Sequence, residues 1–181
     1  MGIDHATRRA VFLDRDGVIN RAVIRNGKPY APSSIDEMEL LPGVAAALCR
    51  LHDAGFHLVV VTNQPEIARG TITRAAVDGM HAHLAALLPI DDFRVCPHDD
   101  TDHCPFRKPK TGMMDDAVRE DGLSVRDSYL VGDRWRDIEA GRRAGCTTIF
   151  IDYGYDEPRP DAPDAVVKSL PEAANWILER T

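Results

Sequence analysis

The sequence predicts an α/β fold in which helices cover both faces of a doubly wound parallel sheet, giving three layers. Two observations support this prediction. Short apolar runs typical of buried strands alternate with segments whose apolar residues recur at helical spacing, and the alternation continues to the C-terminal end. The 181 residues suffice for one domain with a sizeable core but not comfortably for two, so we expect a single domain over residues 1–181.

The expected strand at residues 57–61 is apolar from Leu58 on, as a central strand buried on both faces should be. The expected strands cover residues 10–13, 57–61, 93–96, 128–131 and 147–151, with a last short strand at 165–167. Helices are expected from Pro42-Gly43 to Gly55 and over residues 111–120, 135–144 and 171–178. A further helix has Thr73 at its N-cap and carries the apolar stripe Val77, Met80, Leu84, Leu87 and Leu88.

Residues of about 20–42 are expected to form a flap outside the sheet. Asn26-Gly27 is a strong hairpin signal, and prolines follow at positions 29 and 32. Because this segment comes directly after the first strand, a hairpin or ordered loop here would cover the side chains at the end of that strand. No insertion is long enough to form a separate cap domain, so loops must supply specificity.

The composition argues against several classes of protein. A net charge of −7 is unfavourable for a general nucleic-acid-binding surface, and no apolar run is long enough to span a membrane. Residues 1–6 lack the apolar core of a signal peptide, so we expect a cytoplasmic protein, and a monomer suits so small a domain. In a reducing compartment disulfides are not expected, and Cys49 and Cys146 are predicted to be buried as small apolar residues.

Two carboxylates, Asp14 and Asp16, follow the first apolar run directly and precede Gly17. Side chains alternate along an extended chain, so both carboxylates can point the same way while Arg15 points elsewhere. Gly17 allows a sharp turn just beyond them. Taken alone, this pattern is also typical of a solvated turn.

Two further strands end in polar side chains, at Thr62-Asn63 and at Asp133. The carboxyl ends of parallel strands share one edge of a sheet, so these groups and Asp14 can converge on one site. Magnesium prefers hard oxygen ligands and often takes only one or two carboxylates. A phosphate monoester needs its charge neutralised before an anionic nucleophile approaches, so the residue types fit phosphoryl transfer.

The motifs and their order resemble the haloacid dehalogenase superfamily of phosphotransferases. Residues 12–20 resemble its first motif and residues 132–137 its fourth. The resemblance implies a capless, Rossmann-like fold in which Asp14 is the nucleophile that forms an aspartyl-phosphate and Asp16 is the general acid and base. It further implies that the Thr62 hydroxyl binds the phosphate and that Lys108 neutralises the nucleophile and the phosphoryl group.

The same resemblance implies a magnesium site. Asp14, Asp133 and the backbone carbonyl of Asp16 would be its protein ligands. Asp137 lies one helical turn after Asp133, and two interpretations stay open for it. It is either an N-terminal helix carboxylate that suits the helix dipole or a support for the metal ligands.

Across nearly the whole chain the motifs are similar to those of the D-glycero-D-manno-heptose 1,7-bisphosphate phosphatases, whose subfamily includes the histidinol-phosphate phosphatases. The similar stretches are residues 12–20, 62–70, 96–98, 107–113 and 131–133. The resemblance implies a magnesium-dependent phosphatase of a small phosphorylated metabolite, first the heptose 7-phosphate and alternatively histidinol phosphate or another small phosphomonoester. It implies substrate contacts by Asn20, Asn63 and Arg107. Arg69 is a further candidate, because a guanidinium matches a phosphate in geometry.

A structural zinc site is implied for the loop of about 96–109. Relatives carry Cys-x-His and then Cys-x-Cys, and here Cys96, His98 and Cys104 match while Phe106 replaces the last Cys. Three outcomes are open. His103, Asp99, Asp100 or Asp102 supplies the fourth ligand, water fills it, or zinc is lost and Phe106 packs into the core. A catalytic zinc is not expected.

A different class of function also stays open, that of an inactive metal-binding interaction module that kept the fold. The intact charged set argues against it, because drift should erode clustered charges first.

Overall fold

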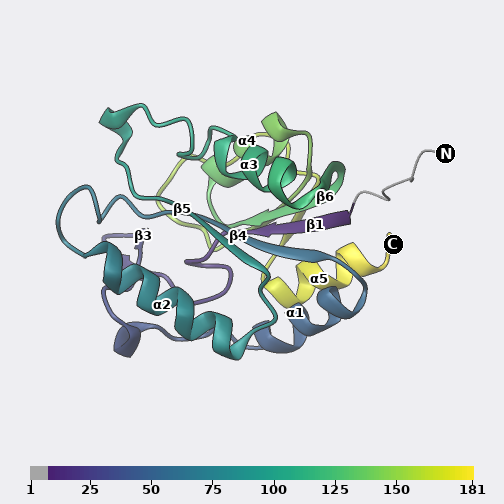
Figure 1. The fold of residues 1–181 in the computed structure, drawn as a ribbon, viewed down its shortest axis with the longest axis horizontal. Helices are drawn as coiled ribbons and strands as arrows, with labels where there is room; N and C mark the ends of the chain where they lie inside the picture. The colour runs from purple at the N-terminus through teal and green to yellow at the C-terminus, as the bar shows by residue number, and fades with distance from the viewer. Residues whose placement is uncertain (1–7) are drawn as a thin grey trace.

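The computed structural model describes residues 8–181. Six strands form one parallel sheet in the order β5-β4-β1-β6-β7-β8, with β1 in its interior (Figure 1). The strands are β1 (Arg8–Leu13), β4 (His57–Asn63), β5 (Asp92–Cys96), β6 (Leu123–Gly132), β7 (Thr147–Ile151) and β8 (Ala165–Val167). The predicted fold class is confirmed. The stretch 1–6, on which the expected absence of a signal peptide rests, lies outside the described residues.

Helices cover both faces of the sheet. They are α1 (Val44–Asp53), α2 (Arg74–Leu87), α3 (Gly112–Asp121), α4 (Trp135–Ala144) and α5 (Leu170–Leu178). Helices α1, α2 and α5 lie on one face and α3 and α4 on the other (Figure 1). Each was predicted within a few residues, because N-caps and left-handed glycines mark several of their ends. Thr73 caps α2 through Ala76 N, and Gly122 and Gly145 end α3 and α4.

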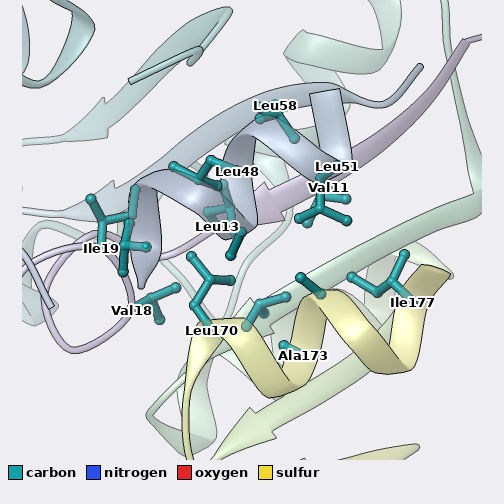
Figure 2. Close-up of a cluster of buried hydrophobic side chains, with 14 of the residues drawn as sticks. Val11, Leu13, Val18, Ile19, Leu48, Leu51, Leu58, Leu170, Ala173 and Ile177 are labelled. Atoms are coloured by element: carbon teal, nitrogen blue, oxygen red, sulfur yellow. The ribbon is translucent and has the colours of Figure 1, made fainter. Parts of the chain in front are cut away.

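The larger core cluster lies between the sheet and the layer of α1, α2 and α5. In Figure 2, Leu13 of β1 and Leu48 of α1 point toward Leu170 of α5, and all three side chains are buried. A smaller cluster lies under α3 and α4 and includes Phe12 and Met114. Alternate residues of β1 therefore serve opposite layers, and the strand is held from both sides.

Two predictions of burial were wrong. Leu87 of α2 is 53% exposed, and Cys49 of α1 is also exposed, whereas Cys146 is buried as predicted. In both helices the apolar stripe is narrower than the sequence suggested. On α2 a buried histidine, His81, takes part in the inward face beside Leu84.

Strand β6 is longer than predicted because its first half is irregular. Its register with β1 shifts between Arg9 and Val11, so Arg9 pairs with Ser124 while Val11 pairs with Tyr129. The Ser128 hydroxyl accepts a hydrogen bond from Ala10 N at 2.8 Å inside this irregularity. The local pattern of apolar residues therefore predicted only the second, regular half of β6.

The predicted flap is a two-stranded hairpin, β2 (Val23–Arg25) and β3 (Lys28–Tyr30). A short 3₁₀ turn at Ile35–Glu37 follows it before α1. Lys28 to Ala31 line the cleft described below, so the hairpin covers the edge of the sheet as expected. Among the residues that the structure describes, no helix is long and apolar enough to cross a membrane.

Leu84 and Leu87 provide a matched test of which face of α2 is buried. Leu84→Ala should lower the free energy of unfolding by about 2–5 kcal/mol, because it leaves a cavity in the larger core cluster. Leu87→Ala should change it by less than about 0.5 kcal/mol, because this side chain is exposed. Urea unfolding of the two variants measures both values, and equal losses would contradict the burial assigned to α2.

Candidate active site

The site lies at the carboxyl edge of the sheet, where β4, β1 and β6 are neighbours. Asp14 follows β1, Asp133 follows β6, and Thr62 and Asn63 are the last residues of β4. Asp14 N donates to Val131 O at 3.0 Å, which extends the pairing of β1 and β6 up to the carboxylates. The sheet order therefore brings together the polar strand ends on which the sequence prediction depended.

Three buried carboxylates form the centre of the site. Oxygen atoms of Asp14, Asp133 and Asp137 lie within 4.8 Å of one another. Both carboxylate oxygens of Asp133 are buried, and neither makes a hydrogen bond of good geometry among the described residues, although the Tyr155 hydroxyl lies near enough to oppose the rise in the pKa of this carboxyl. An unpaired buried carboxylate is costly, and a divalent cation would supply the missing partner. The donor set fits magnesium.

Two glycines make this close approach possible. Gly17 has φ +89°, and a Cβ on it would lie 1.9 Å from Asp133 Oδ2. A Cβ on Gly132 would lie 2.1 Å from Asp137 Cβ. Both distances are far below any real contact, so any larger side chain would push a carboxylate out of place.

Lys108 neutralises part of the cluster. Its Nζ donates to Asp14 Oδ1 at 2.9 Å, to Asp137 Oδ1 at 2.6 Å and to Val61 O at 2.6 Å. Asp137 Oδ2 also accepts a hydrogen bond from Arg134 N at 3.0 Å. Asp137 therefore suits both interpretations, as a carboxylate at the helix N-terminus and as a support for the neighbouring side chains. It caps the N-terminus of α4 and supports the residues beside it.

Burial dominates the proton affinity of these groups. It raises the pKa of Asp14 to about 6, with Lys108 opposing and the charges of Asp137 and Asp16 adding to the rise. Burial and the charges of Asp14 and Asp137 raise the pKa of Asp133 well above its usual value. Burial alone would lower the pKa of Lys108, but the charges of Asp137 and Asp14 raise it instead. The ammonium thus stays charged.

Asp16 has a separate set of partners. Arg15 donates to both of its oxygens at 3.0 Å, Gln64 Nε2 to Oδ2 at 2.8 Å, and Asn20 Nδ2 to Oδ1 at 2.9 Å. The backbone turn beneath is tight, since the amides of residues 18–20 all point at Arg15 O. Its side chain is 14% exposed and faces the cleft beside Asp14.

This arrangement corrects the expected role of Asn20. The residue is fully buried, does not line the cleft, and its amide is used by Asp16 and by Arg21 O. We assign it to the support of Asp16 in place of a substrate contact. Local sequence could not decide between the two, because the turn that carries Asn20 behind Asp16 depends on tertiary packing.

Thr62 and Asn63, the last two residues of β4, also have different surroundings. Thr62 is buried, and its hydroxyl accepts from Gln64 Nε2 at 2.9 Å, which leaves its own proton free to donate. Asn63 lines the cleft, but its amide exchanges two hydrogen bonds of 3.0 Å with the backbone of Lys108. Asn63 therefore holds the lysine loop against β4.

A cleft of about 220 Å³ opens over Asp14 and Asp16. Arg69 and Arg107, the two arginines expected to contact substrate, line the cleft, and each is paired: Arg69 with Asp99, and Arg107 with Asp100. Sequence reasoning did not assign three further cations of its wall, Lys28, Arg134 and Arg136. Arg134 and Arg136 lie inside the fourth motif, between Asp133 and Asp137. Their place in that motif could have indicated from the sequence that they line the cleft.

The second cluster lies on the loop after β5. Donor atoms of Cys96, His98 and Cys104 lie within 4.8 Å of one another, and Cys96 Sγ is 3.9 Å from His98 Nδ1. Two ligands of one tetrahedral zinc would be about 3.6 Å apart. Burial raises the pKa of Cys96 to about 11, so without metal it is a thiol.

The open alternatives for the fourth zinc ligand narrow in the structure. Phe106 is 38% exposed, so its packing into the core, which was expected if zinc is lost, was wrong. His103 does not join the cluster. The three acidic candidates do not join it either, and each is bonded elsewhere: Asp99 to Arg69, Asp100 to Arg107 and Arg136, and Asp102 to Asp99 N.

Magnesium should stabilise the protein more at pH 7.5 than at pH 5. The raised pKa of Asp14 means that its protonated form stabilises the folded state. This gain in the free energy of unfolding is fully present below about pH 4 and is lost as the pH rises through about 6. A cation must displace that proton, so its affinity rises over the same range. Thermal unfolding with and without magnesium at both pH values measures the effect. Asp133→Asn should abolish the rise in unfolding temperature that magnesium causes. An equal rise at both pH values would contradict the prediction.

Comparisons with known proteins identify the family of this chain. A family model described as HAD-hydrolase-like matches residues 105–173. The chain is 33% identical to a D-glycero-D-manno-heptose-1,7-bisphosphate 7-phosphatase of Thermosynechococcus vestitus, covering 94% of this chain and 95% of the relative. It is 36% identical to the enzyme of that name from Chlorobaculum tepidum, covering 82% and 81%.

A solved structure is similar along nearly its whole length. The D,D-heptose 1,7-bisphosphate phosphatase of B. bronchiseptica, complexed with magnesium and phosphate, superposes with a TM-score of 0.82 at 30% identity, covering 96% of this chain and 99% of the other. These relatives are phosphatases, which argues against the inactive module. The chain is a phosphoric monoester hydrolase and belongs to the haloacid dehalogenase superfamily, in the group that contains the heptose bisphosphate phosphatases.

Proposed function

We propose that this protein is a magnesium-dependent phosphatase that removes the 7-phosphate of D-glycero-D-manno-heptose 1,7-bisphosphate through an aspartyl-phosphate on Asp14. One observation carries the proposal. Asp14 lies between a buried ammonium, Lys108, and a buried carboxylate without a hydrogen bond of good geometry, Asp133, at the floor of a cleft lined by cations. A nucleophilic carboxylate in that setting suits attack on a phosphate dianion.

The proposed chemical steps use the side chains at the floor of the cleft. An Asp14 oxygen attacks phosphorus, the bond from phosphorus to the sugar oxygen breaks, and Asp16 gives its proton to that oxygen. Asp16 then takes a proton from a water whose oxygen attacks phosphorus. The bond from phosphorus to the Asp14 oxygen breaks, inorganic phosphate leaves, and the Asp14 carboxylate is regenerated. Lys108 and the Thr62 hydroxyl stabilise the charge on the phosphoryl oxygens.

Magnesium has a defined place in this proposal. Asp14, Asp133 and the backbone carbonyl of Asp16 would hold it, and when bound it would neutralise the charge shared by the nucleophile and the phosphate. Asp137 does not need to ligate, because its oxygens already accept hydrogen bonds from Lys108 and Arg134 N.

The cations of the cleft wall support a substrate with a second anionic group. Arg107 is nearly buried, and Asp100 and His98 O fix its guanidinium. Asp100 also pairs with Arg136, at 3.1 and 3.3 Å, so one carboxylate orients two arginines toward the cleft. We assign the distal phosphate to Arg107 and Arg136, with Arg69 nearer the rim.

Phosphate release from the heptose bisphosphate tests this function. The purified protein with magnesium should release one phosphate per substrate, and Asp14→Asn should abolish turnover because no covalent intermediate can form. Colorimetric phosphate detection measures both. Activity on histidinol phosphate but not on the heptose would move the assignment to that alternative. Release that survives in Asp14→Asn would mean that Asp14 is not the nucleophile.

We also propose a structural zinc held by Cys96, His98 and Cys104, with water as the fourth ligand. The three donors already lie close together, and the loop they close carries Arg107 into the cleft. An open fourth position weakens such a site relative to a closed one.

Phe106→Cys should restore a closed four-ligand site and tighten zinc binding by about tenfold or more. Competition with a chromophoric zinc chelator measures the affinities of both proteins, and Cys104→Ser is the control that should lose zinc. If the wild-type protein bound no zinc while Phe106→Cys also bound none, the loop would not be a metal site.

The cytoplasmic location and the monomeric state stay part of the proposal. A phosphorylated sugar is an intracellular metabolite class, and a cleft built from one chain needs no second copy. Sedimentation of the purified protein measures the latter.

A further inference from the structure

A buried chain of polar groups lies behind the general acid and base and is not used by the chemistry described above. It runs from His81 on α2 through Arg15 to Asp16. Arg15 is fully buried and His81 is 6% exposed. A buried guanidinium is retained only where its donors are satisfied, so each contact along this chain needs a reason.

The geometry of Arg15 leaves it little freedom. Its Nε and Nη2 donate to the two oxygens of Asp16 at 3.0 Å, and Nη2 also donates to Gln64 Oε1 at 3.2 Å. The remaining nitrogen, Nη1, lies 3.1 Å from His81 Nε2, and among the described residues it has no other hydrogen-bond partner. The contact at Nη1 therefore holds the end of the guanidinium that points away from Asp16.

His81 is suited to hold the far end. Its ring stacks on Phe93 of β5, with centroids 4.7 Å apart and planes 20° apart. Burial, and then the charge of Arg15, lower the pKa of His81 to about 4, so the imidazole is neutral near pH 7. Because Arg15 can only donate, Nε2 must accept, and the ring proton therefore lies on Nδ1.

We propose that His81 is a positioning residue for the reaction: by accepting from Arg15 Nη1 and stacking on Phe93, it fixes the guanidinium that aims the Asp16 carboxyl at the leaving-group oxygen. The inference rests on the proposed role of Asp16 as general acid. It assigns to α2, which lies outside the cleft, a direct part in the orientation of a catalytic group.

Leaving groups of different acidity separate this role from a structural one. An alkyl phosphate needs a well-placed proton donor, because its alkoxide is a poor leaving group. 4-Nitrophenyl phosphate needs none, because nitrophenolate leaves readily. The ratio kcat/KM reports the steps up to departure of the alcohol, so it isolates the donation of this proton from the later hydrolysis of the aspartyl-phosphate.

The test compares His81→Leu with His81→Gln on two esters. The alkyl ester is the heptose bisphosphate, and the aryl ester is 4-nitrophenyl phosphate. His81→Leu should lower kcat/KM for the alkyl ester by about tenfold or more, and for 4-nitrophenyl phosphate by less than about threefold. His81→Gln keeps an acceptor oxygen for Arg15 and should recover most of the alkyl activity. His83→Leu is the matched control, since His83 is exposed on the same helix, and it should change neither ester.

Equal losses on the two esters would overturn the inference and make His81 a merely structural residue. So would a Gln variant as impaired as the Leu variant. Failure of the wild-type protein on the heptose bisphosphate would instead overturn the proposed substrate, and the same comparison would then use another alkyl ester that the protein hydrolyses. The two failures are therefore distinct.

A second measurement needs neither activity nor a variant. Nitrogen NMR of the labelled wild-type protein reports the tautomer of each histidine. His81 should have a proton on Nδ1 and none on Nε2 at neutral pH. A proton on Nε2 would exclude acceptance from Arg15 and would overturn the inference.

Discussion

The contact between Lys108 and two buried carboxylates is the interaction on which the rest of the site depends. Asp14, Asp133 and Asp137 lie together out of water, where like charges repel and each lacks hydration. Lys108 neutralises part of this charge through Asp14 and Asp137. The carboxylate of Asp133 keeps no hydrogen bond of good geometry, so the protein holds the cluster in a form that a divalent cation completes. Strongly perturbed groups of this kind are typical of active sites.

The two carboxylates of the first motif are supported from opposite layers of the fold. Asp14 is held by Lys108, from the loop before α3, and is next to Asp137 of α4, both on the face of α3 and α4. Asp16 is held by Arg15, whose far end reaches His81 of α2 on the other face. The proposed nucleophile and the proposed proton donor thus have different environments although one residue separates them. In the proposed mechanism, that difference would let one carboxyl attack while the other transfers a proton.

The loop with the cysteines is connected to the cleft through Arg107. This side chain donates to His98 O within the loop and to Asp100, while Asp100 also receives Arg136 from α4. Any element that fixes the loop, including a metal on Cys96, His98 and Cys104, would also fix the cations that face the substrate. The packing of Phe106 would fix the loop less firmly than a bound metal, because this side chain is 38% exposed.

Sequence patterns were enough to predict the order of strands and helices, the carboxylates at the strand ends and the position of Lys108 in its motif. These features depend on local periodicity and on short motifs, which a chain carries without its fold. Tertiary structure decided which polar residues face the cleft and which stand behind it. Asn20 looked like a substrate contact but lies behind Asp16, and Asn63 lines the cleft while its amide also holds the backbone of Lys108. His81 was given no role from the sequence, and it meets Arg15 from another layer. Leu87 and the irregular half of β6 were missed for the same reason. Burial and hydrogen-bond partners are set by residues far away in the chain, and no local pattern contains them.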